Sequence, residues 1–297
     1  MKHLIIVLLI LLTTNVFSQT SDSTQKSDSS PKLNADTSIA GLGVAVSPSH
    51  LNFNLKPGQS KTQSVKITND TKKPYKFKIS FQDFNVEGKD RVNGIKAGEG
   101  TNSLSKWTTA TPSFVEVAPG QSAKIAITVK IPDDESANKA AWCIMMVDQA
   151  EERKSLSFAG DPNDKKMAFG VIPVFAFGVY IYQNPPNVAV NKVEIQGFKL
   201  NTVKDKDGKT KRTIEIEAKN IGDGIAFSTA YVELTNTSTG KQQRLMVKQF
   251  TIYPGGIRNF SYDLPAGLEK GNYTAVGVLD FGSKEEIQAA EMEFKIE

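Results

Sequence analysis

Cysteine and histidine are almost absent from this sequence. Its 297 residues include one cysteine, Cys143, and two histidines, His3 and His50. A single thiol cannot form an internal disulfide, and these three side chains cannot supply the ligand set of a zinc or haem site. A serine hydrolase would need His50 as its base, and no nucleophile-elbow pattern accompanies that residue. The sequence therefore predicts a protein that is not an enzyme and that has no metal and no cofactor.

A strong excess of charge is also missing. The chain has 36 Lys and Arg against 32 Asp and Glu, a formal net charge of +4, which is too small to suggest nucleic acid as a partner. Hydrophobic residues make up 39% and charged residues 23%, as in an ordinary globular protein. A chain of this length typically folds into about two domains.

The first eighteen residues have the layout of a secretory signal peptide. Lys2 supplies the positive charge, and residues 4–12 form an uncharged apolar core that is too short to span a bilayer. The pattern predicts cleavage between Ser18 and Gln19 and export to the periplasm or the cell surface. Residues 19–42 are rich in Ser, Thr, Asp and Lys, which favours a flexible tether. No transmembrane segment is expected in the mature chain.

Alternation of apolar and polar residues dominates the remainder of the sequence. It is clear in residues 75–81 and 125–131 and again in 214–217 and 292–297, and Pro-Gly and Asn-Asp pairs separate such segments. This period of two is typical of strands with one buried face. Expected strands in the second half are 190–200, 212–219, 228–236, 243–253, 258–264, 272–281 and 287–296. The sequence predicts an all-β protein of two tandem immunoglobulin-like sandwiches, at 43–184 and 185–297.

A weak internal repeat is consistent with two similar domains. Residues 65–70 (VKITND) resemble residues 216–222 (IEAKNIG), since each is a strand closed by a turn that contains Asn. Each half also has a Pro-Gly turn ahead of an alternating strand. The pattern suggests a duplication.

Several short motifs resemble one family of surface proteins. In order, they are VSP at 46–48, PGQS at 57–60, VKITN at 65–69, SLSKW at 103–107, VAPGQ at 117–121 and IPD at 131–133. Further matches are KNIG at 219–222, IYPGG at 252–256 and KGNY at 270–273. The series resembles the WxL-interacting cell-surface proteins, whose first domain is a peptidoglycan-binding immunoglobulin-like module. The resemblance implies peptidoglycan or a surface protein as the ligand.

The plan of two sandwiches is also similar, more distantly, to the periplasmic pilus-assembly chaperones. In those proteins an Arg and a Lys of the first domain hold the terminal carboxylate of the bound subunit. The local pattern puts the Arg position at His50 and the Lys position at about Tyr180. Since a neutral His and a Tyr do not form a site with two cations, that mechanism does not transfer directly.

The apolar run from Met167 to Tyr182 is the most unusual part of the mature sequence. One interpretation is that it forms the last strands of the first domain and is buried. The alternative is an exposed edge strand that pairs with a strand of a partner protein. By period two, Val171, Phe175, Phe177 and Val179 share one face, and we hypothesise that they line such a site.

Three single residues, Trp107, Cys143 and His50, are also possible functional groups. Trp107 with Lys106 is a candidate glycan-binding surface, and a Trp next to Leu104 is more often part of a core. Cys143 lies in the apolar run 140–147, which favours a buried thiol over a reactive one. His50 is expected to be an exposed strand residue.

The sequence thus predicts an exported binding protein of the cell envelope that holds peptidoglycan or a partner protein. The alternative is a periplasmic chaperone for pilus or fimbrial assembly that acts by β-strand complementation. The sequence leaves the identity of the ligand and the oligomeric state open.

Overall fold

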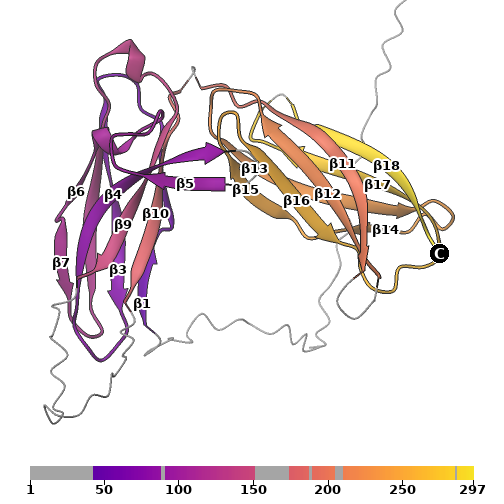
Figure 1. Cartoon of the computed structure of the whole chain (residues 1–297), viewed down its shortest axis with the longest axis horizontal. Coiled ribbons are helices and arrows are strands. Elements are labelled where there is room, and N and C mark those ends of the chain that lie inside the picture. The colour runs from indigo at the N-terminus through magenta and orange to yellow at the C-terminus, as the bar shows by residue number, and fades with distance from the viewer. Residues whose placement is uncertain (1–42, 88–90, 151–173, 187–188, 205–209, 285) are drawn as a thin grey trace, which may run out of the picture. The chain divides into compact units, whose positions relative to one another are not determined.

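The computed structural model describes residues 43–87, 91–150, 174–186, 189–204, 210–284 and 286–297 (Figure 1). The predicted signal peptide and tether lie outside them. The described residues form strands, with two short 3₁₀ helices, η1 (Ser105–Trp107) and η2 (Glu135–Ala137). No helix among them is long and apolar enough to cross a membrane. The predicted fold class, an all-β chain of two tandem immunoglobulin-like sandwiches, is confirmed.

The first sandwich packs two sheets face to face. In the described residues, one sheet has the order β1 (Val44–Ser47), β3 (Ser60–Asn69), β8 (Ser122–Lys130) and β6 (Thr108–Thr111). The other has the order β2 (His50–Phe53), β10 (Ala176–Gln183), β9 (Ala141–Gln149), β4 (Tyr75–Glu87) and β5 (Arg91–Ile95), with β7 (Phe114–Val117) also paired to β4.

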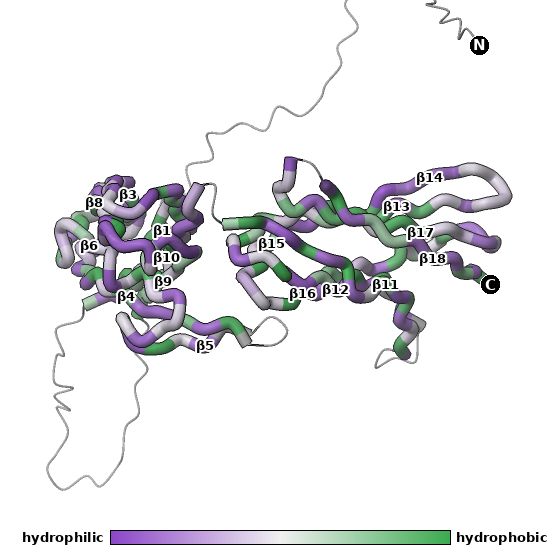
Figure 2. Tube along the Cα trace, turned by 90° about the horizontal axis from the view of Figure 1, so that it is seen from above, coloured by the Kyte–Doolittle hydropathy of each residue, from purple (hydrophilic) through white to green (hydrophobic). Residues whose placement is uncertain are grey.

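Alternating strand residues fill the space between these sheets. Val65 and Ile67 on β3 and Ile125 on β8 are fully buried, and Lys66, between the first two, is exposed. Hydrophobic and hydrophilic residues follow one another along the strands (Figure 2). Cys143 on β9 lies in the same core, and burial raises the pKa of its thiol. The prediction of a buried cysteine is therefore confirmed.

The beginning of the first sandwich changes from one sheet to the other. Strand β1 pairs antiparallel with β3, and β2 pairs parallel with β10. Pro48 stands between the two strands and has no N–H to donate to a ladder, and the chain passes from one sheet to the other at this point. As a result, the short strand β2 lies beside only one half of β10.

The second sandwich has a similar plan. Its sheets, as far as they are described, have the orders β11 (Val193–Lys204), β12 (Thr210–Asn220), β16 (Ile257–Asp263) and β14 (Gln242–Arg244), β13 (Ala226–Asn236), β17 (Gly271–Asp280), β18 (Gln288–Ile296). Strand β15 (Lys248–Ile252) also pairs with β13. Buried residues such as Ile216, Val232 and Phe260 form its core.

One predicted strand, 243–253, is interrupted. Arg244 pairs with Glu233 and Lys248 pairs with Ala230, so three residues on this strand face two on β13. The extra residue makes a bulge, and the side chain of Met246 is 74% exposed. The strand is therefore divided into β14 and β15.

The side chain of Asn69 closes the turn after β3. It is fully buried, and its Nδ2 donates hydrogen bonds to the carbonyl oxygens of Val117 at 2.9 Å and Lys73 at 2.7 Å. Its Oδ1 accepts the N–H of Thr71 at 3.0 Å, which is the local bond of an Asx turn.

Asn220 makes the same set of bonds in the second sandwich. Its Nδ2 donates to the carbonyl oxygens of Ile252 and Gly224, both at 2.8 Å, and its Oδ1 accepts the N–H of Gly222 at 2.9 Å. In each sandwich, the side chain therefore joins the end of one strand to a neighbouring segment of the chain.

A Pro-Gly turn faces each of these asparagines. The N–H of Gly120 donates to the Asn69 carbonyl at 2.8 Å, and the N–H of Gly255 donates to the Asn220 carbonyl at 3.0 Å. Both glycines have positive φ, 68° and 73°, where a side chain would be strained. The weak sequence repeat thus corresponds to one structural unit that occurs in both sandwiches.

Candidate functional site

In the part of the chain that the structure describes, half of strand β10 has a partner on one side only. All of β10 pairs with β9, from Ala176 opposite Asp148 to Gln183 opposite Ala141. On its other side, the ladder with β2 begins at Tyr180. Among the described residues, the stretch 176–179 is therefore an open edge of the sheet.

The hydrogen bonds nearby show which peptide groups face that edge. The N–H of Tyr180 donates to the carbonyl of Ser49 on the β2 side at 3.0 Å, whereas the carbonyl of Phe175 accepts the N–H of Gln149 on the β9 side at 2.8 Å. Because successive residues of a strand point their peptide groups in opposite directions, the N–H and C=O of Ala176 and Gly178 face the open edge.

The four residues predicted to line a partner site do not form an exposed row. Val179 is 1% exposed, and Phe175 and Phe177 are half-buried against the core of the first sandwich. The ring of Phe175 meets that of Tyr75 edge-on at 5.3 Å. Val171 lies outside the described residues. The role of these four residues stays a prediction, and the side chain of Val179 belongs to the core.

The opposite face of β10 carries aromatic side chains near the end of the strand and no side chain at Gly178. The Tyr180 and Tyr182 rings stack at 6.0 Å, and the His50 ring is 6.4 Å from that of Tyr182. Two places further toward the beginning of the strand, Gly178 is exposed and has no side chain. A Cβ there would lie 3.2 Å from Cγ2 of Ile144, so a larger residue requires Ile144 to move.

His50 and Tyr180, the positions at which the chaperone resemblance places two cations, stand opposite each other in the β2–β10 ladder. Both line a hollow of about 680 Å³ that also includes Arg258 of β16. The Nε of Arg258 donates to the Thr251 carbonyl at 3.3 Å, and its guanidinium lies 5.3 Å from the Phe250 ring centre. Sequence reasoning missed this cation, since no motif surrounds it.

Two residue pairs, Tyr182 with Tyr253 and Asn184 with Ile225, form hydrogen bonds between the first and the second sandwich. The hydroxyl oxygens of Tyr182 and Tyr253 are 3.2 Å apart. Asn184 donates to the Ile225 carbonyl at 3.1 Å and accepts the Ile225 N–H at 3.0 Å. Burial is the main reason that the pKa of both tyrosines is raised, so both hydroxyls stay protonated at neutral pH.

Lys106 and Trp107 lie in a different place, in η1. Trp107 is half-buried against the core of the first sandwich, and Lys106 is exposed. Neither lines the hollow beside β10. Their role as a glycan-binding surface stays a prediction.

The turn that carries these two residues is built around the buried carboxylate of Asp83. The Gly98 N–H lies 2.7 Å from Asp83 Oδ2 and 2.9 Å from Ser105 Oγ, and the Gly100 N–H lies 3.3 Å from Asp83 Oδ2. Asp83 is 1% exposed. The Ser-Leu-Ser-Lys-Trp motif therefore has a structural task, which is to close the loop over Asp83.

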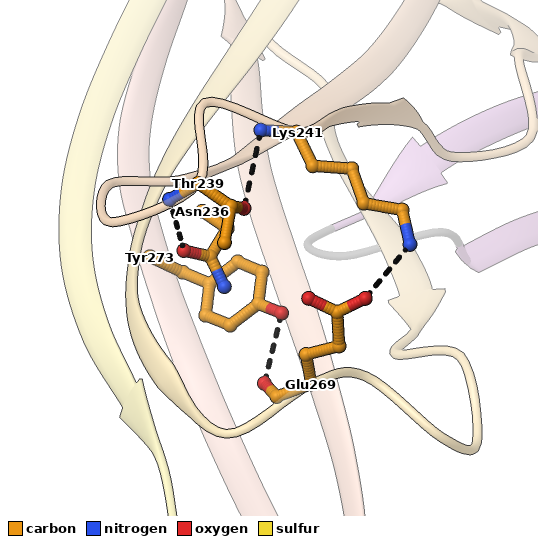
Figure 3. Close-up of polar contacts among 5 residues, drawn as sticks. All are labelled: Asn236, Thr239, Lys241, Glu269 and Tyr273. Atoms are coloured by element: carbon orange, nitrogen blue, oxygen red, sulfur yellow. Dashed lines mark hydrogen bonds and ion pairs between the residues drawn. The ribbon is translucent and has the colours of Figure 1, made fainter.

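A second polar cluster is occupied by its own contacts (Figure 3). The Lys241 ammonium lies 3.0 Å from the Glu269 carboxylate, and the Tyr273 hydroxyl donates to the Glu269 carbonyl at 2.9 Å. Asn236 Oδ1 accepts the Thr239 N–H at 3.1 Å. These bonds join the β13–β14 turn to the loop before β17. They indicate a structural role.

No family model matches the chain, and no curated protein matches it. The resemblance to the WxL-interacting proteins therefore receives no support and stays a prediction.

Solved structures of fimbrial chaperones are similar to the chain. The class 5 fimbriae chaperone CfaA is 17% identical, with 84% of this chain and 98% of that chain covered and a TM-score of 0.41. The chaperone–tip subunit complex CsuC–CsuE of Acinetobacter baumannii is 14% identical, with 83% of this chain and 97% of that chain covered and a TM-score of 0.42. The E. coli chaperone DraB is 13% identical, with 86% of this chain and 98% of that chain covered and a TM-score of 0.38. Likenesses at this level assign no function.

Proposed function

We propose that the protein is a non-enzymatic binding protein that takes up an extended segment of another envelope protein as an added strand on β10. The observation that carries the proposal is the open edge at 176–179, where the peptide groups of Ala176 and Gly178 face outward. Strand addition at such an edge provides main-chain hydrogen bonds for affinity. Because the predicted signal peptide implies export, we expect the partner to be a protein of the periplasm or the cell surface.

The open stretch differs from two other edge strands of the molecule. Strand β18 exposes Glu291, Glu293 and Lys295 along its length, and β11 carries a β-bulge. Charges and bulges on an edge discourage pairing with other chains. Residues 176–179 read Ala-Phe-Gly-Val and have no charge, which supports a role in pairing.

The backbone alone does not hold a partner tightly. Two outward residues offer two donors and two acceptors, and each net hydrogen bond contributes about 0.5–1.5 kcal/mol, or roughly 2–6 kcal/mol for four. Association costs about 4–15 kcal/mol in lost freedom of motion. Side-chain contacts therefore have to supply the remaining affinity.

Capture of a partner from the organism's own envelope fraction tests the proposal. Ala176→Pro removes one outward N–H, and an edge strand tolerates proline at such a position. Ala176→Ser keeps the N–H and is the matched control. We expect the serine variant to capture the same proteins as the unmodified chain and the proline variant to lose them. Equal capture by a folded Ala176→Pro variant contradicts the proposal.

A further inference from the structure

Resting on the proposed strand addition, we infer that the bound segment presents an aromatic side chain opposite Gly178. The outer face of β10 carries full aromatic rings at Tyr180 and Tyr182 and none at Gly178. The hollow of about 680 Å³ extends over Gly178 and is lined in part by Ser49, His50 and Tyr180. The bare glycine thus stands at one end of an aromatic surface, next to unfilled space.

The direction of the Gly178 peptide groups fixes where a guest side chain goes. They face the open edge, so the guest residue opposite Gly178 is joined to it by hydrogen bonds. Side chains of residues directly opposite each other lie on the same face of a sheet, with Cβ atoms about 4.5–5.5 Å apart. The guest side chain at this place therefore lies over Gly178 and beside the ring of Tyr180.

An aromatic ring suits that position for two reasons. Glycine in a strand leaves its backbone uncovered, and an aromatic side chain on the neighbouring strand covers it. Tyr180 is the neighbouring ring on β10, and Phe227 and Phe250 are further aromatic residues that line the hollow. Aromatic rings about 4.5–7 Å apart attract each other beyond the effect of burial alone. An alanine or a small polar residue leaves the hollow unfilled.

Synthetic peptides with one variable residue provide the probe. We choose acetylated and amidated heptapeptides of the sequence Thr-Thr-Val-X-Val-Thr-Thr, where X is Phe, Leu or Ala. A shift of register by two residues places only Thr over Gly178, and a shift by one places Val, whose side chain is smaller than that of Phe or Leu. Binding is followed through the amide resonances of the full mature chain.

We expect the Phe peptide to bind at least about 10-fold more tightly than the Ala peptide, with the Leu peptide between them. Gly178→Val covers the backbone at this position with a side chain of its own and reduces this ratio to about 2-fold or less. Gly197→Val is the control, because a Cβ at Gly197 meets Glu217 at 3.5 Å, an ordinary contact distance. We expect the Gly197→Val variant to show the same ratio of Phe-peptide to Ala-peptide affinity as the unmodified chain.

The outcomes separate this inference from the proposed function. Equal affinity for the Phe and Ala peptides, with binding lost in Ala176→Pro, overturns the aromatic preference and leaves strand addition in place. Binding that Ala176→Pro does not weaken overturns strand addition itself. Absence of binding for all three peptides overturns both. The peptide series needs no variant, so a Gly178→Val protein that fails to fold does not affect its result.

Discussion

Replacing Asn69 by alanine removes the polar bridge that closes the turn after β3. The side chain is fully buried and makes three hydrogen bonds to main-chain groups, those of Val117, Lys73 and Thr71. Alanine leaves the Val117 carbonyl buried without this donor. The variant therefore tests whether the unit that recurs in both sandwiches contributes to stability.

The expected decrease in the free energy of unfolding follows from these three hydrogen bonds. A buried group left without its partner costs about 1–3 kcal/mol, and each of the two partly buried bonds contributes about 0.5–1.5 kcal/mol. The total is about 2–6 kcal/mol, a large part of the 5–15 kcal/mol that stabilises a typical domain. Asn69→Asp costs more than Asn69→Ala, since it turns a carboxylate oxygen toward two carbonyl oxygens.

Urea unfolding followed by tryptophan emission measures this loss in the first sandwich. Both tryptophans of the sequence, Trp107 and Trp142, belong to that sandwich. The control is Asn138→Ala, which removes a single exposed bond of 3.4 Å to Glu135. A loss for Asn69→Ala below about 0.5 kcal/mol, no larger than that of the control, would refute the reasoning.

Three further predictions follow from burial and exposure. Because burial raises the pKa of Cys143, its thiol should react with a thiol reagent at about pH 8 only after unfolding in urea, and prompt reaction of the folded chain contradicts the core placement. Burial also raises the pKa of Tyr253 and Tyr262 above the usual 10.0, so the unfolded chain ionises first and stability should fall as pH rises past about 10. A urea midpoint that is the same at about pH 9 and pH 11 disagrees with this. If Lys106 and Trp107 form a glycan surface, Trp107→Ala should abolish binding of cell-wall fragments, and unchanged binding removes both residues from the site.

Alternation identified most of the fold from the sequence. Residues such as Val65 and Ile67 repeat at a period of two that only a strand with one buried face explains. The sequence does not show where β14 ends and β15 begins, because Leu245, Met246 and Val247 are all apolar and alternation does not indicate which of them leaves the ladder. Which residue leaves the ladder depends on how many residues of the partner strand β13 lie between the two paired segments.

The candidate site was predictable only in part. The sequence indicated an apolar strand within residues 167–182. In the structure Phe177 and Val179 lie on one face of β10, and Phe175, just before the strand, packs against the same core. Which face meets the core depends on the sheet opposite, and the open peptide groups of residues 176–179 depend on where β2 begins, at His50. Arg258 is distant in sequence and stands in no motif, so folding alone brings it to the hollow.

Amide hydrogen exchange at Gly178 tests the central claim most directly. The free protein is compared with the complex that co-purifies from its own envelope. We predict that exchange at Gly178 slows at least about 10-fold in the complex, because its N–H then donates to the added strand, while exchange at Gly197 stays unchanged. Unchanged exchange at Gly178 in a complex that stays intact would contradict strand addition on β10.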